Sequence, residues 1–470
     1  MWAALDLAFG GRDGDGGSAP APMRTSGRAS SGPAASYKAG HRTCRCPGFG
    51  GCRPEAVCGR RFAWAMLRVR GYCRMLAGYL AELRRRLYPG PGLPHPIGFP
   101  AATDIDFIEL ADLHNTIINN IGDPEKDGRE PRNSKAIERA VVGQLIELFG
   151  GDLRDCWGYV TQAGSTEGNQ FGLWLAREHF PTGVLYFSAA AHYSVPKAAR
   201  ILRMSGDCVR VAADDSGEMD YDDLAKAVTA RADRPAIVVA TVGTTMTEAV
   251  DDVARIHTAL DQARVQSRHV HVDGALSGVP LALDGGPIAR LLSRSETGAA
   301  SYDADSVCIS GHKFFATPHP NGVVLARREH VWRVSHAVDY VDGIDATWSG
   351  SRTGHNAVEL WLALEVGLDG HRQRVARSRA LAAYLHQRLV AAGWTAWRHP
   401  HAFTVMLESP PLAILNRWSL ATSGGWSHVI CVPGLSRGTI DHFLNELGTN
   451  PNAGHGRKIA PVIQGLAATA

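Results

Sequence analysis

The fold is decided by the stretch Ser306-Val307-Cys308-Ile309-Ser310-Gly311-His312-Lys313. It begins as a short apolar strand and leads through small and polar residues to Lys313. A second apolar strand upstream, His269-Val270-His271-Val272, ends in the same way on Asp273. Because the carboxyl ends of parallel strands meet at one edge of an open α/β sheet, Lys313 and Asp273 are predicted to lie together at that edge.

The pairing of this lysine with this aspartate predicts a cofactor. Enzymes that use pyridoxal 5'-phosphate (PLP) attach its aldehyde to a lysine amine as a Schiff base. They also place an aspartate at the pyridine nitrogen, whose proton lets the ring accept electrons from the substrate. Neither residue is informative alone, but Lys313 and Asp273 together predict a PLP site.

The sequence around this pair alternates short β-rich runs with helical stretches between residues 155 and 330. That alternation predicts a mostly parallel sheet flanked by helices. The predicted strands are 185–187, 209–212, 237–241, 269–272, 307–309 and 323–326. A long helical segment follows (358–368, then 375–392), and then a smaller portion with strand candidates 404–407 and 428–432. We therefore predict an α/β fold with a large domain and a small C-terminal α+β domain.

The chain divides into five predicted parts. Residues 1–74 are rich in Gly, Ala, Ser, Pro and Arg and are expected to be disordered or a misassigned N-terminal extension, with Met66 and Met75 as candidate starts of the functional polypeptide. The other parts are an N-terminal helical segment (75–150), a large cofactor-binding domain (151–345), a small C-terminal domain (346–448) and a tail (449–470). Within the helical segment, Ser134 is expected to cap the start of a helix.

Length and composition are those of an ordinary globular protein. The 470 residues are enough for more than one core, and 45% hydrophobic and 20% charged residues are typical values. The formal charge of +3 owes much to an arginine-rich N-terminus, so no nucleic-acid partner is expected. No apolar run is long enough to span a bilayer, and the first residues lack the features of a signal peptide. We therefore expect no membrane association and a cytoplasmic location.

Cysteine spacing favours free thiols, with a zinc knuckle at four clustered cysteines as the disfavoured alternative. Of the nine cysteines, five are scattered singly and are predicted to be free thiols: Cys73, Cys156, Cys208, Cys308 and Cys431. Four others, Cys44, Cys46, Cys52 and Cys58, lie close together, but their spacing lacks the C-x2-C pairs of established zinc sites. We therefore expect no metal in this protein.

Other predicted strand ends also carry polar residues. Gly164-Ser165-Thr166 opens a helical stretch, where backbone N–H groups form a phosphate cradle, although a plain Gly-rich loop that caps a helix has the same pattern. His192 follows the first predicted strand, where an aromatic ring stacks on a flat cofactor, although a lone histidine is more often structural. Thr244 follows another strand and offers a hydroxyl, and Ser310 and His312 are further candidate phosphate donors.

With these motifs the sequence resembles the group II PLP-dependent amino-acid decarboxylases, most closely the bacterial histidine decarboxylases, with the plant serine decarboxylases as near relatives. The likeness runs from about Asp104 to Leu447, and its motifs occur in family order: Trp157-Gly158-Tyr159-Val160-Thr161, His192-Tyr193-Ser194-Val195, Gly243-Thr244-Thr245, Ser310-Gly311-His312-Lys313 and Ser349-Gly350-Ser351-Arg352. Two segments lean towards the histidine enzymes: Ala396-Trp397-Arg398, and Leu420-Ala421-Thr422-Ser423-Gly424 followed by His428. The resemblance implies a PLP-dependent transferase-like fold of type I and a homodimer with active sites at the subunit interface.

The resemblance also implies a role for each site residue. Lys313 would be the Schiff-base lysine, His192 the ring-stacking residue and Asp273 the partner of the pyridine nitrogen. Ala275 would pack under the ring, and Thr244 would lie near its phenolic oxygen. The phosphate would be held by Gly164, Ser165, Thr166, Ser310 and His312, with Ser351 from the other subunit. Tyr340 would be a mobile-loop tyrosine that protonates the substrate α-carbon, although it could equally be a packed interface aromatic.

The sequence departs from the family pattern in two places. The run Gln162-Ala163-Gly164-Ser165 is one residue longer than the family's phosphate loop, which leaves open which hydroxyl meets the phosphate. The run Phe315-Ala316-Thr317-Pro318-His319-Pro320-Asn321 replaces more typical residues after the lysine, in a loop expected to line the substrate entrance.

The function implied is PLP-dependent decarboxylation of a small L-amino acid, with histidine, giving histamine and carbon dioxide, as the first candidate. Serine or another amino acid is the alternative substrate, and an aminotransferase-like reaction is the alternative chemistry. Transamination is disfavoured because no arginine stands where it could clamp an α-carboxylate. A non-catalytic descendant is disfavoured because Lys313, Asp273 and His192 are all present.

Overall fold

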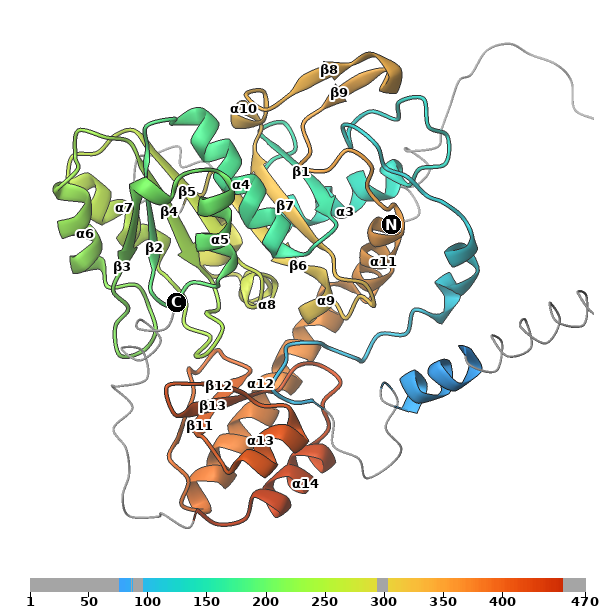
Figure 1. Ribbon diagram of the computed structural model, residues 1–470, viewed down its shortest axis with the longest axis vertical. Helices are drawn as coiled ribbons and strands as arrows, with labels where there is room; N and C mark the ends of the chain where they lie inside the picture. The colour runs from blue at the N-terminus through green and yellow to red at the C-terminus, as the bar shows by residue number, and fades with distance from the viewer. Residues whose placement is uncertain (1–75, 86, 88–95, 294–302, 451–470) are drawn as a thin grey trace, which may run out of the picture. The chain divides into compact units, whose positions relative to one another are not determined.

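The computed structural model describes residues 76–85, 87, 96–293 and 303–450, which Figure 1 colours along the chain. The chain forms two compact units, residues 1–93 and 94–470. In the first unit, residues 76–85 are helical, as their apolar spacing predicts. The predictions for residues 1–74, for the four clustered cysteines and for most of the C-terminal tail lie outside the described residues. In the part of the chain that is described, no helix is long and apolar enough to cross a membrane.

The large domain is built on a seven-stranded sheet with the order β1-β7-β6-β5-β4-β2-β3. The strands from β6 to β3 run parallel, and β7 is antiparallel to both of its neighbours, β6 and β1. The strands are β1 Cys156–Thr161, β2 Val184–Ser188, β3 Cys208–Val211, β4 Ala236–Thr241, β5 Arg268–Asp273, β6 Ser306–Ser310 and β7 Gly322–Arg327. The predicted mostly parallel sheet is confirmed, and each of its predicted strands matches the observed one to within a residue at either end.

Helices connect the parallel strands, so that each strand returns in the same direction (Figure 1). They are α4 Ser165–His179, α5 Ser194–Ile201, η2 Ser205–Asp207, α6 Tyr221–Thr229, α7 Val253–Gln262, α8 Gly278–Leu283 and η3 Pro287–Arg290. Two of them start at aspartates: the carboxylates of Asp220 and Asp252 each accept two backbone N–H groups from the first turn of α6 and α7. This connectivity brings the carboxyl ends of the strands to one edge of the sheet.

A smaller C-terminal domain carries a four-stranded antiparallel sheet. Its strands, in sheet order, are β10 Ala396–Trp397, β11 Thr404–Glu408, β13 Trp426–Ile430 and β12 Ala421–Ser423. Helices α12 Gly367–Ala391, α13 Leu412–Trp418 and α14 Arg437–Leu447 share one apolar core with it. The predicted strand 428–432 is shifted: β13 begins two residues earlier and ends at Ile430, because the chain then turns at Pro433 and Gly434, where φ is +96°.

The remaining elements flank the large sheet. They are η1 Ile108–Asn115, α3 Lys135–Leu148, α9 Gly311–Phe314, α10 Arg328–Val331, the hairpin strands β8 His336–Val338 and β9 Gly343–Asp345 with η4 Asp339–Val341 between them, and α11 His355–Leu364. Helix α3 begins after Ser134 as predicted, but the side chain of Ser134 makes no capping hydrogen bond. Its hydroxyl instead donates to the carbonyl of Gly354 at 2.8 Å, so this serine ties α3 to the start of α11.

A buried ion pair makes a second tie between these elements. The guanidinium of Arg352 bonds to the carboxylate of Glu138, and neither side chain is more than 1% exposed. Glu138 also accepts from the Val160 N–H at 2.8 Å and from Asn120 Nδ2 at 2.9 Å. Arg352→Leu should therefore lower the free energy of unfolding by about 3–5 kcal/mol, because it leaves a buried carboxylate without its counter-charge. Denaturant titration of variant and wild type measures the loss.

The exposed pair of Arg132 and Glu130 provides the matched control. Solvent screens this pair, so Arg132→Leu should leave the unfolding midpoint unchanged. Equal midpoints for Arg352→Leu and the control would contradict the role given to the buried pair.

Candidate active site

Lys313 lies in α9, directly after β6, and Asp273 is the last residue of the neighbouring strand β5. The two strands pair in parallel, with Asp273 opposite Cys308, so the structure brings the lysine and the aspartate to one edge of the sheet. Lys313 is half-buried, and its Nζ has no hydrogen-bond partner among the described residues. Burial lowers the pKa of the Lys313 amine, while the negative charge of Asp273 acts in the opposite direction.

The carboxylate of Asp273 is buried and held from two sides. Asn169 Nδ2 donates to Oδ2 at 2.7 Å, and the Ala275 N–H donates to Oδ1 at 3.1 Å. Because each oxygen accepts a hydrogen bond, the carboxylate has a fixed orientation at the end of β5. Sequence reasoning did not select Asn169. The available signal was its place in the second turn of α4, where an asparagine without solvent contact needs polar partners.

Behind Asn169, a chain of hydrogen bonds runs back along β5 and β6. His271 Nε2 lies 2.9 Å from Asn169 Oδ1, and His271 Nδ1 lies 2.8 Å from the hydroxyl of Ser306. Since the Asn169 amide group faces Asp273, its oxygen faces His271 and must accept from Nε2–H. The hydroxyl of Ser306 then donates to Nδ1. Burial lowers the pKa of His271 to about 4, which is consistent with the neutral ring that these directions require.

His192 joins the same network through Ser194. Asn169 Nδ2 donates to Ser194 Oγ at 2.8 Å, and the Ser194 hydroxyl donates to His192 Nδ1, also at 2.8 Å. Burial lowers the pKa of His192, the charge of Asp273 opposes that change, and the charge of Lys313 adds to it. The structure thus connects His192 and Asp273 through one asparagine and fixes the ring of His192 in place.

A cavity of about 460 Å³ opens beside His192. Thr244, in the loop after β4, also lines it, and its volume is in the range of small-molecule sites. Thr244 is buried, its Oγ1 lies 2.8 Å from Thr247 Oγ1, and it accepts from the Ala249 N–H at 3.0 Å. The hydroxyl of Thr244 is therefore oriented by its own loop at the wall of the cavity.

The start of α4 forms a cradle of backbone N–H groups. Gly164 precedes the helix with a φ of +61°, and as the N-cap residue it has no side chain to cap the first turn. The Ser165 N–H donates to Ser310 Oγ at 3.2 Å, and the two serine hydroxyls lie 3.0 Å apart. A Cβ at Gly164 would lie 2.7 Å from His312 Cε1, so only glycine fits here. These contacts bring Gly164, Ser165, Ser310 and His312 together, with the half-buried Thr166 next in the helix.

The tautomer of His312 limits what it can do at this cradle. Its Nδ1 lies 3.1 Å from the carbonyl of Asn321, which can only accept, so Nδ1 carries a proton. Burial lowers the pKa of His312, and a neutral ring therefore has no proton on Nε2. His312 can donate to a phosphate only if the phosphate charge restores its second proton.

Two predicted site residues lie apart from this group. Ser351 is exposed and accepts from Asn119 Nδ2 at 3.3 Å. Tyr340 is 76% exposed and lies in η4, on the β8–β9 hairpin, which Figure 1 shows well away from α9. The structure of this one subunit does not bring either residue next to Lys313.

Most of the loop after Lys313 is part of the core and not of an open entrance. Phe315, Thr317 and Asn321 are each less than 5% exposed. Pro318, His319 and Pro320 are exposed, and Nδ1 of His319 lies 2.5 Å from the carboxylate of Glu359. The exposed side chains of this loop are therefore those at 318–320, and not the aromatic residue Phe315.

Glu248 is a buried residue that sequence reasoning missed. It has a positive φ of +58° in the loop after β4. One carboxylate oxygen accepts from the N–H groups of Phe403 (3.0 Å) and Thr404 (2.8 Å) and from the Thr404 hydroxyl (2.6 Å), and the other accepts from Ser277 Oγ (2.9 Å). Glu248 therefore fixes β11 of the small domain against the loop that carries Thr244.

These residues fit a PLP molecule in three respects. The amine of Lys313 has no hydrogen-bond partner within the described part of the chain, and the N-cap residue of α4, Gly164, has no side chain to cap its first turn. Asp273 offers a buried carboxylate beside them whose orientation is fixed. An aldehyde, a phosphate dianion and a protonated pyridine nitrogen require these same three groups.

Comparison with known proteins agrees with this chemistry. Residues 180–397 match the family described as the pyridoxal-dependent decarboxylase conserved domain. The chain is 40% identical over 352 residues to a histidine decarboxylase of Mesorhizobium japonicum, covering 75% of this chain and 92% of the relative. It is 39% identical to a histidine decarboxylase of Pseudomonas entomophila over 75% of this chain and 85% of that one. Among solved structures, L-methionine decarboxylase of Streptomyces sp. 590 matches with a TM-score of 0.70 and 25% identity, covering 82% of this chain and 95% of that one.

Proposed function

This chain belongs to the pyridoxal-dependent decarboxylase family, and from that premise we propose that it converts L-histidine to histamine and carbon dioxide. It is a PLP-dependent amino-acid decarboxylase with the fold of that family. The observation that carries the choice of substrate is the 40% identity to a histidine decarboxylase over 92% of that relative's length. The histidine-like segments around Trp397 and His428 support the same choice.

We assign the chemical roles as follows. When bound, PLP accepts the electron pair that remains on the substrate α-carbon after carbon dioxide leaves. Lys313 anchors the cofactor, and its lowered pKa favours the neutral amine that can form this bond. Asp273, held by Asn169 and Ala275, keeps a proton on the pyridine nitrogen. His192 and Ala275 would hold the two faces of the cofactor ring, and the hydroxyl of Thr244 would be available to its phenolic oxygen.

The cradle at the start of α4 holds the phosphate in this proposal. Gly164, Ser165 and Thr166 supply backbone and hydroxyl donors, and Ser310 adds a hydroxyl 3.0 Å from that of Ser165. A phosphate dianion beside His312 raises the pKa of that imidazole, which restores the proton on Nε2 and makes it a donor. His312 therefore binds phosphate as a cation.

The substrate assignment is tested with a panel of amino acids. Purified enzyme with PLP is incubated with histidine, serine, methionine and the aromatic amino acids, and carbon dioxide and amine are quantified. Histidine should give the highest kcat/KM, with histamine and carbon dioxide in equal amounts. A higher kcat/KM for serine or methionine would reassign the substrate. If an amino acid lost its amino group and no carbon dioxide were released, the reaction would be a transamination.

We also propose a homodimer in which Ser351 and Tyr340 act in the partner's active site. Both side chains are exposed in the single subunit, and no hydrogen bond among the described residues joins either of them to Lys313. Tyr340 would then protonate the α-carbon from across the interface. In a symmetric dimer each subunit supplies the same residues to the other, so two differently inactivated subunits can form one intact site.

Subunit mixing tests this arrangement. Lys313→Ala and Tyr340→Phe are each expected to be nearly inactive. After unfolding and refolding together in equal amounts, they should recover about a quarter of the wild-type activity, because half of the dimers are mixed and each mixed dimer has one intact site. No recovery beyond the separate variants, or a monomeric mass by light scattering, would refute shared sites.

A further inference from the structure

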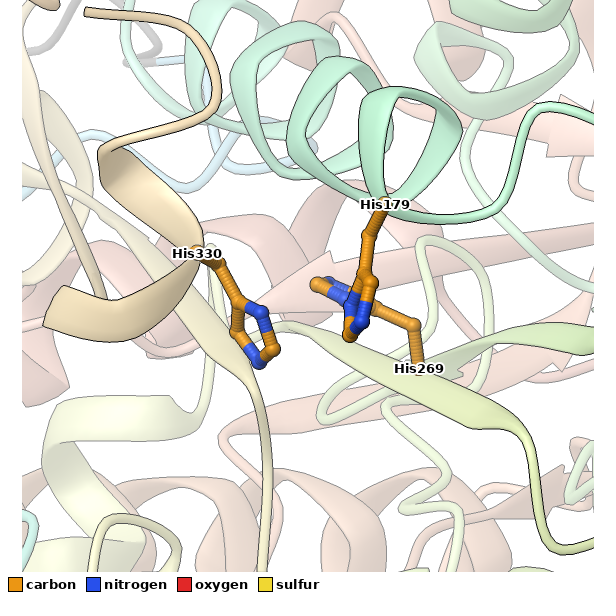
Figure 2. Close-up of side chains that lie close together, drawn as sticks. All are labelled: His179, His269 and His330. Carbon is orange, nitrogen blue, oxygen red and sulfur yellow. The ribbon is translucent and has the colours of Figure 1, made fainter.

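Three histidines from separate elements converge on one point of the large domain (Figure 2). His179 is the last residue of α4, His269 is the second residue of β5 and His330 lies in α10. One ring nitrogen from each lies within 4.8 Å of those of the other two. The ring centroids of His179 and His330 are 4.6 Å apart, and those of His269 and His330 are 5.3 Å apart.

Two buried nitrogens in this cluster have no hydrogen-bond partner. They are His179 Nδ1 and His269 Nδ1, and only five buried side-chain atoms in the described residues are left in this state. His269 is fully buried, and His179 is half-buried. Buried polar atoms nearly always make a hydrogen bond, so two buried ring nitrogens without a partner in one cluster indicate a missing ligand.

The remaining contacts orient the rings for metal binding. His330 Nε2 lies 2.9 Å from the carboxylate of Asp305, which also accepts from the Val270 N–H at 2.7 Å. Nε2 must therefore carry a proton, which leaves the lone pair on Nδ1. His269 Nε2 lies 3.4 Å from Ser306 Oγ, and because this hydroxyl donates to His271, it accepts from His269. Histidine ligands in metal sites make such outward hydrogen bonds to carboxylates and hydroxyls.

We propose that His179, His269 and His330 bind a divalent transition metal ion, with Zn²⁺ the best match. Three imidazoles and no carboxylate in direct contact favour zinc, nickel or copper over magnesium or calcium, which prefer oxygen. Zinc–nitrogen bonds of about 2.0–2.1 Å would hold the three nitrogens well inside the 4.8 Å within which they now lie, so binding would draw the rings together. Water completes the tetrahedron.

The site is structural and lies apart from the PLP chemistry. His269 stands at the amino end of β5 and Asp273 at its carboxyl end. The metal would join α4, β5 and α10, three elements that the chain brings together from positions 179, 269 and 330. The sequence prediction of no metal site considered only cysteine spacing and could not detect this convergence.

Zinc content of the full-length enzyme with PLP bound tests the proposal. The protein is treated with EDTA, incubated with one equivalent of Zn²⁺ or Mg²⁺, passed through gel filtration and measured by mass spectrometry of the elements. Wild type should retain about one zinc ion and no magnesium per protomer, and zinc should raise its Tm. His330→Gln should lose the zinc and the Tm rise. Asp305→Asn, which keeps all three ligands, should weaken zinc binding by about 10–100-fold.

His336→Gln is the matched control, because it removes an exposed imidazole on β8. It should bind zinc as the wild type does. If His330→Gln does not fold, His179→Gln at the half-buried end of α4 replaces it. The proposal is overturned if wild type retains no zinc, or if the control and cluster variants retain equal amounts.

Discussion

Lys313→Ala should abolish decarboxylation while the protein stays folded. The amine of Lys313 is the proposed covalent anchor of the cofactor, and the methyl group of alanine cannot form that bond. Without this covalent bond the cofactor is no longer held and oriented in the site, so turnover should fall by at least about 10²–10⁴-fold. Because Lys313 Nζ has no hydrogen-bond partner among the described residues, its removal leaves no buried group unsatisfied. Carbon dioxide release measures turnover, and thermal unfolding checks the fold.

Covalent labelling distinguishes this role from a packing role. After borohydride reduction, peptide mass spectrometry should find a pyridoxyl group on Lys313 of the wild type and none in the variant. Lys197→Ala, which removes an exposed lysine of α5, is the control and should keep both label and activity. Wild-type turnover by Lys313→Ala would show that the assigned mechanism is wrong.

Asp273→Asn should lower kcat by about 10²–10⁴-fold with little change in volume. Asparagine cannot keep a proton on the pyridine nitrogen, because it has no charge to stabilise it. The hydrogen bonds around position 273 also disfavour asparagine. Both Asp273 oxygens accept, one from Asn169 and one from Ala275, so an amide NH₂ at either position faces another donor. Asn169 cannot reverse its own amide, since its oxygen accepts from His271.

The kinetic and spectroscopic readouts for this variant are separate. kcat should fall while the protein still binds PLP, because Lys313 and the phosphate cradle are intact. The visible absorbance band should persist but change position, since the charge of the ring has changed. An unchanged kcat would remove Asp273 from the chemistry, and loss of PLP binding would instead assign it to cofactor retention.

The large sheet could be predicted from sequence because its strands are buried. The residues of β4, β6 and β7 are all buried, so these strands occur as short apolar runs with clear ends. The hairpin strands β8 and β9 lack buried faces and gave no such run. Strand β1 is fully buried, but its residues Trp157, Gly158 and Tyr159 were noticed only as a motif. Exposure therefore explains why the hairpin strands were missed, whereas β1 was missed although it is buried.

Lys313 and Asp273 could also be predicted from the sequence, but the residues that hold the site in position could not. Lys313 and Asp273 follow strand ends, and strand ends have a known place in an α/β sheet. Asn169 and Glu248 act through the partners that the folded chain brings to them, including residues more than 100 positions away. The three clustered histidines belong to the same class, since no local spacing connects positions 179, 269 and 330.

The buried carboxylate of Glu248 has a consequence for how substrate enters. Swinging the small domain away on a hinge would strip three donors from this carboxylate at Phe403 and Thr404. An unsatisfied buried charge is costly, so we expect the two domains to move as one body during turnover. Entry of the substrate would then depend on surface segments such as the β8–β9 hairpin.

Fluorescence energy transfer between labels on the two domains should stay constant as substrate is added. In Glu248→Ala the energy transfer should change with substrate, because the carboxylate no longer joins the domains.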